Sequence, residues 1–284
     1  MTQIFKATRQ PMGRLVRGSV TWALLGAALL STSAFLSGCA GNGVGTGAST
    51  TEPVTESDEP EIRKRARIRT SLATGYFENG QDTVALDEVK QALIADANYG
   101  PAYVLRGLIY MRLSNDALAE ESFRRALQIN PNDPDALHNY GWFACGHKRE
   151  KEALSLFEKA AANPTYGGQA KTLMAKGVCE MRLGLEKEAE GSFARAYQLD
   201  PNNPITGYNL AALMFKRGEY DRAQFYIRRL NGTEMANAET LWLGIKVEKR
   251  MNNQTVADQL TQQLQRRFPN SPELAAYRRG AFYE

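Results

Sequence analysis

The sequence predicts an all-α solenoid of about six helical hairpins, followed by a short C-terminal capping helix. Three observations lead to this prediction. Small residues recur about every 34 positions, alanines and large apolar residues follow each of them at fixed distances, and matched stop and start signals separate the units. A period of this length indicates a two-helix unit that buries its apolar face against its neighbours. The small residues are Ala73, Gly107, Gly141, Gly177, Ala211 and Gly244, spaced by 34, 34, 36, 34 and 33 positions.

The chain opens with a segment that is typical of an export signal. Residues 1–19 carry four basic residues and no acid, and the apolar stretch VTWALLGAALLSTSAFL follows at 20–36. A basic region followed by an apolar run predicts a signal peptide over residues 1–38. The run ends in Leu36-Ser37-Gly38-Cys39, which resembles a bacterial lipobox. That resemblance implies that Cys39 carries the lipid anchor, and Ala40 after it implies the outer membrane. The alternative is an uncleaved anchor with an incidental cysteine.

Residues 39–61 are expected to form the lipidated cysteine and a flexible linker. Their Gly, Thr, Ser and Pro content buries too little apolar area to offset the entropy of ordering. Without the signal, 31 basic residues face 31 acidic ones, so the mature chain is formally neutral. This balance lacks the basic footprint of nucleic-acid binding, and no nucleic-acid partner is expected.

Residues 62–284 carry the repeats. Alanine follows each of the first five small residues after twelve positions, and a large apolar residue follows after sixteen, such as Phe123 after Gly107. Small residues on both helices let the two backbones approach closely, and the large residue is expected to fill the gap to the next unit. The pattern resembles the tetratricopeptide repeat, a helical hairpin of 34 residues.

Proline and capping residues mark the junctions between units. A proline stops one helix, a side chain that can cap the next helix follows, and a second proline takes that helix's first position. Ser271 and Pro272 repeat the start signal and predict the short capping helix. The complete junctions are Pro131, Asp133 and Pro134, and then Pro201, Asn203 and Pro204.

The sequence contains no recognisable catalytic constellation. His138, His147, Cys145 and Cys179 match no zinc-finger spacing, and no G-x-S-x-G, Walker loop or H-E-x-x-H occurs. We therefore expect no enzyme, no cofactor, no metal and no small-molecule substrate. Cys145 and Cys179 lie on the first helices of consecutive units, and an exported protein meets an oxidising compartment. This predicts a Cys145–Cys179 disulfide, with two buried free thiols as the alternative.

The stretch EIRKRARIR (61–69) packs five basic residues after an acidic run. Such a stretch beside a membrane could contact anionic lipid head groups. Its apolar spacing is also that of a helix, so we favour the first turns of the opening helix.

The first helix of each unit is expected to line the concave side of the solenoid, where an extended peptide or a partner helix would bind. Asn139 and Asn209 hold equivalent places two units apart, which suits a peptide backbone or a terminal carboxylate. Ordinary packing between repeats is the alternative for any single residue. The inward set includes Leu105, Leu108, Met111, His138, Asn139, Trp142, Met174, Val178, Met181, Tyr208, Asn209, Ala212 and Phe215.

The stretches NYGWFACG (139–146), NPTYGGQAKTLMAKGVCEMRLG (163–184) and ETLWLGIKV (239–247) resemble the type IV pilus biogenesis and stability lipoproteins, the pilotins of the pilus secretin. The resemblance implies a non-enzymatic escort that binds secretin subunits and promotes their assembly in the outer membrane. It also implies a secretin contact in the groove of the first repeat, at Thr70, Thr74 and Phe77. The alternative function is a lipoprotein scaffold for β-barrel assembly or for cell-wall machinery.

Overall fold

The structure is a computed structural model that describes residues 58–282, which contain thirteen α-helices and no strand. The predicted signal peptide, Cys39 and nearly all of the linker lie outside the described residues. None of the described helices is long and apolar enough to cross a membrane. In chain order the helices are α1 (Glu61–Glu78), α2 (Asp82–Ala95), α3 (Gly100–Arg112), α4 (Asp116–Ile129), α5 (Pro134–Gly146), α6 (Glu150–Ala161), α7 (Gln169–Arg182), α8 (Glu186–Leu199), α9 (Pro204–Lys216), α10 (Tyr220–Asn231), α11 (Ala238–Arg250), α12 (Gln254–Arg267) and α13 (Pro272–Arg278).

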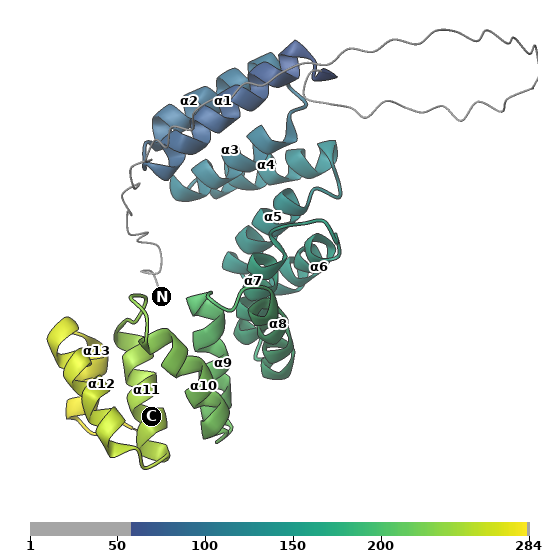
Figure 1. Ribbon diagram of the computed structural model, residues 1–284. Coiled ribbons are helices and arrows are strands. Elements are labelled where there is room, and N and C mark those ends of the chain that lie inside the picture. The colour runs from purple at the N-terminus through teal and green to yellow at the C-terminus, as the bar shows by residue number, and fades with distance from the viewer. Residues whose placement is uncertain (1–57, 283–284) are drawn as a thin grey trace, which may run out of the picture. The chain divides into compact units, whose positions relative to one another are not determined.

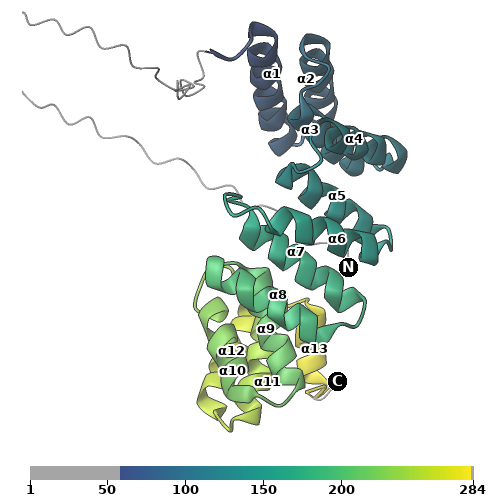
Figure 2. The ribbon, with the colours of Figure 1, turned by 90° about the vertical axis from the view of Figure 1, so that its right-hand side faces the viewer.

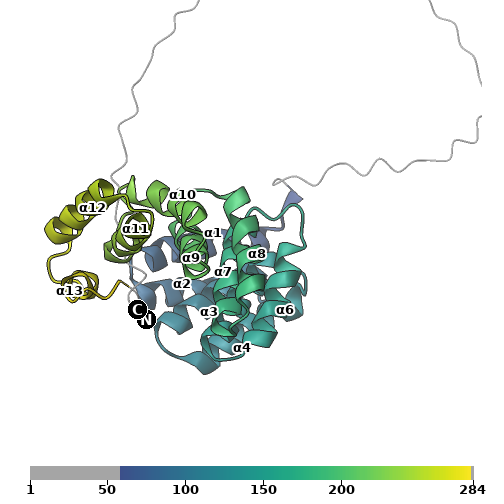
Figure 3. The same cartoon turned by 90° about the horizontal axis from the view of Figure 1, so that it is seen from below.

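Consecutive helices pair into six hairpins, from α1–α2 to α11–α12, and each hairpin packs against the next (Figures 1 and 2). Among the first helices, α1 contacts α3, α3 contacts α5, α5 contacts α7 and α9 contacts α11, whereas consecutive second helices make no comparable contact. The first helices therefore lie on the inner side of the row, as expected for a solenoid. Helix α13 packs on α11 and covers the last hairpin (Figure 3). The predicted all-α solenoid with a capping helix is confirmed.

The small residues of the period set how closely each hairpin closes. A Cβ atom added to Gly107 would lie 2.5 Å from the ring of Phe123, which is far inside van der Waals contact. Gly141 and Gly177 face Phe157 and Phe193 in the same way, at 2.9 and 2.7 Å. The large residue therefore occupies the space above the glycine of its own hairpin.

The hairpins that carry alanine in place of glycine have a smaller residue opposite. Ala73 is followed sixteen positions later by Val89, and Ala211 by Ile227, and all four residues are fully buried. The larger residue on the first helix is thus offset by a smaller residue on the second helix. The expectation that the large residue fills the gap to the next unit also holds for Phe123, whose ring centroid lies 5.9 Å from that of Phe143 in the following hairpin.

The junction signals act as helix caps. The Asp133 carboxylate accepts a hydrogen bond from the backbone N–H of Ala136 at 2.8 Å, and Asn203 and Ser271 cap α9 and α13 in the same manner. Each cap satisfies one N–H that the first turn of a helix leaves without an intrahelical partner. Each of the three helices then begins with a proline.

All six turns inside the hairpins place one residue in the left-handed region of the backbone. The turns after α1, α7 and α9 use glycine, whereas those after α3, α5 and α11 use Ser114, Lys148 and Asn252 at φ of 57°, 61° and 58°. A left-handed conformation costs an L-residue more than it costs glycine. The three non-glycine turns therefore carry a small local strain.

Candidate protein-binding groove

The first helices meet along a repeated seam on the inner side of the row. The residue four positions after the small residue of one hairpin packs near the residue two positions after the small residue of the next. Each of the first four pairs shares one apolar cluster, and in the fifth pair the ammonium of Lys246 lies 5.4 Å from the centroid of the Phe215 ring. The pairs are Phe77–Ile109, Met111–Phe143, Cys145–Cys179, Met181–Leu213 and Phe215–Lys246.

The third seam pair is a disulfide bond between Cys145 and Cys179, whose Cα atoms lie 6.0 Å apart. This separation falls within the range that a disulfide spans without backbone movement. Both cysteines are buried, and Trp142 and Leu154 pack against their cluster. The guanidinium of Arg182 donates to the backbone oxygen of Cys145 at 2.9 Å. The pair thus joins α5 to α7 at the point where the seam crosses the centre of the row.

The centre of the groove is an apolar surface on α7 and α9. Its residues are half-buried and pack against the fully buried core around Phe193, Leu210 and Met214. Burial raises the pKa of the Tyr208 hydroxyl, so this group stays protonated and can donate a hydrogen bond. An apolar surface with an interspersed polar group suits an extended peptide or an amphipathic helix. The residues are Met174, Val178, Met181, Tyr208, Ala212 and Phe215.

Asn139 and Asn209 adopt the same local arrangement two hairpins apart. The side-chain Nδ2 of Asn139 donates to the Asp135 carbonyl at 2.8 Å, and that of Asn209 donates to the Ile205 carbonyl at 2.7 Å. Each bond uses one of the two N–H donors of the amide. The structure therefore holds both amides against their own helices, and their contact with a partner backbone stays a prediction.

The predicted contact residues of the first hairpin are engaged within the protein. Thr70 is buried, and its hydroxyl donates to the Ala66 carbonyl at 2.8 Å. The Thr74 hydroxyl donates to the Thr70 carbonyl at 3.0 Å. The half-buried ring of Phe77 lies beneath the guanidinium of Arg112, at 3.3 Å from the ring centroid. Their role in partner binding stays a prediction.

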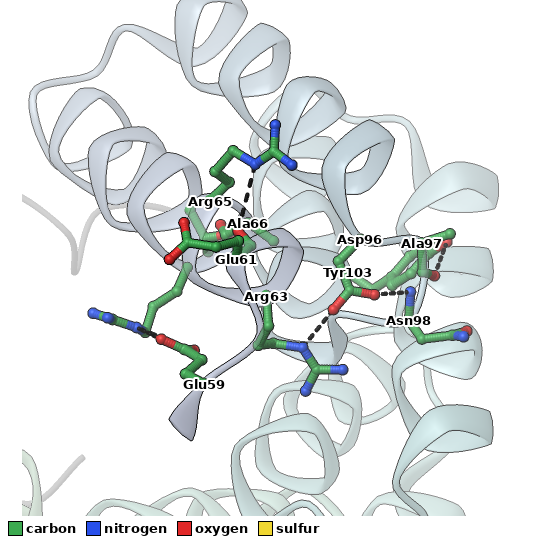
Figure 4. Close-up of polar contacts among 11 residues, drawn as sticks. Glu59, Glu61, Arg63, Arg65, Ala66, Asp96, Ala97, Asn98 and Tyr103 are labelled. Atoms are coloured by element: carbon green, nitrogen blue, oxygen red, sulfur yellow. Dashed lines mark hydrogen bonds and ion pairs between the residues drawn. The ribbon is translucent and has the colours of Figure 1, made fainter. Parts of the chain in front are cut away.

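The basic stretch at the start of α1 pairs with acids of the same protein (Figure 4). Arg63 contacts Asp96 in the loop before α3, Arg67 contacts Glu59 at 3.0 Å, and Arg69 contacts Glu88 of α2 at 2.7 Å. Arg65 donates to the Glu61 carbonyl at 3.4 Å. These pairs agree with the interpretation of the stretch as the opening turns of the first helix.

The two histidines each serve the packing. The ring Nδ1 of the buried His138 lies 2.9 Å from the Thr172 hydroxyl, and burial lowers the pKa of His138 to about 3. His147 bonds to the Phe143 carbonyl and to Asp116, which raises its pKa. Within residues 58–282, no three or more His, Cys, Asp or Glu side chains gather where they could hold a metal ion.

The sequence-based groove stops at the fifth hairpin and misses its continuation on α11 and α13. There Trp242, Tyr277 and Phe282 pack on one another, with the Trp242 and Phe282 ring centroids 5.2 Å apart. Lys246 and Lys249 lie over these rings. Carrying the register on to Gly244 would have found Lys246, but the aromatic cluster depends on how α13 folds back.

Comparison with known proteins agrees with the geometry. Three models of the tetratricopeptide repeat match residues 100–133, 122–155 and 149–204. Together with the six hairpins, these matches define a tetratricopeptide-repeat protein, a class of scaffold that acts through protein–protein interaction.

The relatives narrow the class to one family. The crystal structure of PilW, described as a widely conserved type IV pilus biogenesis factor, is 32% identical, covers 77% of this chain and 99% of its own, and has a TM-score of 0.67. The type IV pilus assembly protein PilF of Pseudomonas aeruginosa is 26% identical over 202 residues, which are 71% of this chain and 80% of PilF. A solved structure of P. aeruginosa PilF shares the fold at 24% identity, with a TM-score of 0.74 over 78% of this chain and 100% of its own. The chain belongs to the PilF/PilW family of tetratricopeptide-repeat proteins of type IV pilus biogenesis, and the resemblance seen in the sequence is confirmed.

Proposed function

We propose that this protein is a pilotin: an outer-membrane lipoprotein that binds subunits of the type IV pilus secretin and promotes their localisation and assembly. The observation that carries the proposal is the similarity to the pilus biogenesis factor PilW, which extends over 99% of the PilW chain. The similarity covers 77% of this chain, whereas the repeat models match only residues 100–204, so it extends beyond the generic repeat.

The groove supports a binding role rather than a chemical one. Its apolar surface lies on α7 and α9, and the disulfide ties α7 to α5 of the preceding hairpin. A preformed surface loses little entropy when a partner segment binds. A secretin segment that is apolar on one face would bury that face against Met181, Tyr208 and Phe215.

The N-terminal segment supports a tethered mode of action. A lipid on Cys39 followed by a linker of about twenty residues would confine the hairpins near the inner face of the outer membrane. Confinement raises the effective concentration of the groove for secretin subunits that arrive at the same membrane. The tether would therefore increase the rate of capture without adding any contact to the interface.

Affinity purification of the full chain from detergent-solubilised envelopes tests the partner. The proposal expects the pilus secretin among the proteins that co-purify at near-stoichiometric amount, as identified by mass spectrometry. Recovery of β-barrel assembly proteins or of cell-wall hydrolases in place of secretin would contradict it and would favour the alternative scaffold.

The variant Cys39→Ala tests the tether separately. We expect folded hairpins, shown by unchanged helical circular dichroism, together with loss of secretin multimers from the outer-membrane fraction. Normal secretin multimers in that fraction would show that the anchor is dispensable.

A further inference from the structure

Lys246 occupies a place in the seam that apolar residues fill elsewhere. The residue two positions after the small residue is Ile109, Phe143, Cys179 or Leu213 in the second to fifth hairpins, and each of these is at most 4% exposed. In the sixth hairpin the equivalent residue is Lys246. The register is supported by Leu260, sixteen positions after Gly244: a Cβ added to Gly244 would lie 2.4 Å from the Asn231 side chain and 3.1 Å from Leu260.

The ammonium of Lys246 lies between two aromatic rings. Its Nζ is 5.4 Å from the ring centroid of Phe215 on α9 and 5.6 Å from that of Trp242 on α11. Burial alone accounts for the lowered pKa of this half-buried group. Within residues 58–282, no hydrogen bond or ion pair satisfies the Lys246 ammonium. A partly desolvated cation without a counter-charge is unfavourable, and the rings compensate for only part of that cost.

A second ammonium stands one turn further along α11. The Nζ of Lys249 lies 4.2 Å from the ring centroid of Phe282 and 5.7 Å from that of Tyr277. Residues three apart on a helix are neighbours on one face, so Lys246 and Lys249 present their charges together. By contrast, two other lysines that reach a neighbouring helix are paired, Lys216 with Glu186 and Lys176 with Glu158.

We propose that Lys246, supported by Lys249, binds the carboxylate of an Asp or Glu side chain within an extended segment of the partner protein. Apolar surface borders the two ammonium groups, with Phe215 beside Lys246 and with Tyr277 and Phe282 beside Lys249. A bound segment that places its acidic side chain on Lys246 would complement this surface best with apolar residues before and after the acidic one. The preferred segment therefore has an acidic residue flanked by aromatic or aliphatic ones. The inference depends on the proposed function only in that the groove receives a protein chain.

Phage display of random heptapeptides, joined to the coat protein through their C-termini, tests the inference without reference to any natural partner. Selection on the full chain in detergent is expected to enrich peptides with one Asp or Glu between apolar residues. The most enriched peptide should lose at least about tenfold in affinity when its acid is changed to the matching amide, because a charged hydrogen bond is replaced by a neutral one. Fluorescence anisotropy measures that ratio.

Three variants separate charge from packing. Lys246→Met should lower the affinity for the acidic peptide at least about tenfold and leave the affinity for the amide peptide unchanged. The fold should persist, because apolar residues occupy the equivalent position in other hairpins. Lys246→Arg should retain binding, and Lys187→Met on the exposed surface of α8 should have no effect. A thermal melt of each variant shows whether the fold is retained.

The inference is overturned if selection enriches no acidic peptides, or if acid and amide peptides bind equally. It is also overturned if Lys246→Met binds as tightly as the native chain, or if peptides bind only after removal of residues 283–284. Acid-specific binding without secretin in the affinity purification would leave this inference standing and would contradict the proposed function. If secretin still co-purifies with the Lys246→Met variant and both peptides bind equally, this inference is overturned and the proposed function stands.

Discussion

The contact between Gly107 and Phe123 allows a direct test of how the hairpins close. Gly107→Ala places a methyl group 2.5 Å from the Phe123 ring, which is fully buried and already packed against Phe143 of the next hairpin. The ring cannot move aside without disturbing that second contact. Overpacking of this kind costs up to about 3 kcal/mol, and the better helix propensity of alanine returns about 1 kcal/mol. We expect a net loss of about 2 kcal/mol in the free energy of unfolding.

A double-mutant cycle isolates the steric part. Phe123→Ile removes part of the ring and should cost about 2 kcal/mol, between a volume-conserving exchange and a change to alanine. The pair Ala211 and Ile227 shows that alanine and isoleucine fit together at the same place. The double variant should therefore cost about 2 kcal/mol, well below the additive value, which is a coupling of about 2 kcal/mol in favour of the pair.

Urea unfolding followed by far-ultraviolet circular dichroism, with the disulfide intact, measures all three variants. Gly191→Ala is the matched control, because Gly191 lies inside α8 with no atom within 4 Å of an added Cβ. It should stabilise the helix by about 1 kcal/mol. Additive losses in the double variant, or a stabilising Gly107→Ala, would refute the packing account.

Three further predictions concern the turns, a buried carboxylate and the disulfide. Lys148→Gly should raise stability by about 1 kcal/mol, since glycine adopts the left-handed φ of 61° at lower cost, and a lower Tm would contradict this. Glu248 is fully buried and bonded to Arg228, Gln224 and Asn253; burial by itself raises the pKa of this carboxyl, but these hydrogen bonds and the charge of Arg228 together outweigh it and lower the pKa. The contribution of Glu248 to stability is therefore present above the unfolded pKa of about 4.3 and is lost as pH falls through the lower folded pKa. Glu248→Gln should cost about 1–3 kcal/mol in the free energy of unfolding at pH 7 and should flatten the decline in stability at acidic pH. An unchanged decline would argue against this. Mass mapping of the oxidised protein should recover Cys145 and Cys179 in one linked peptide, and reduction should cost about 2–4 kcal/mol, whereas two separately alkylated peptides would exclude the bond.

Much of the scaffold could be predicted from the sequence, because the contacts that define it repeat. Gly107, Gly141 and Gly177 and their phenylalanines recur at one spacing, and the caps Asp133, Asn203 and Ser271 lie where the prolines place them. Local periodicity determines both the helices and their pairing.

The details of the groove could not be predicted, because they depend on individual side-chain contacts that the repeat pattern does not determine. Thr70 and Asn139 have polar groups that could face a partner, yet both donate to a carbonyl one turn earlier on their own helix. Arg63 meets Asp96 across 33 positions. The cluster around Trp242 exists only because α13 folds back on α11.

Site-specific photo-crosslinking in cells that make type IV pili tests the central claim, that the inner groove receives the secretin. A benzophenone amino acid would replace Phe215 in the groove, or Phe225, which is 62% exposed on α10. The account predicts a secretin adduct from position 215 and none from position 225. An adduct from position 225 with none from position 215 would place the partner on the opposite surface and contradict the account.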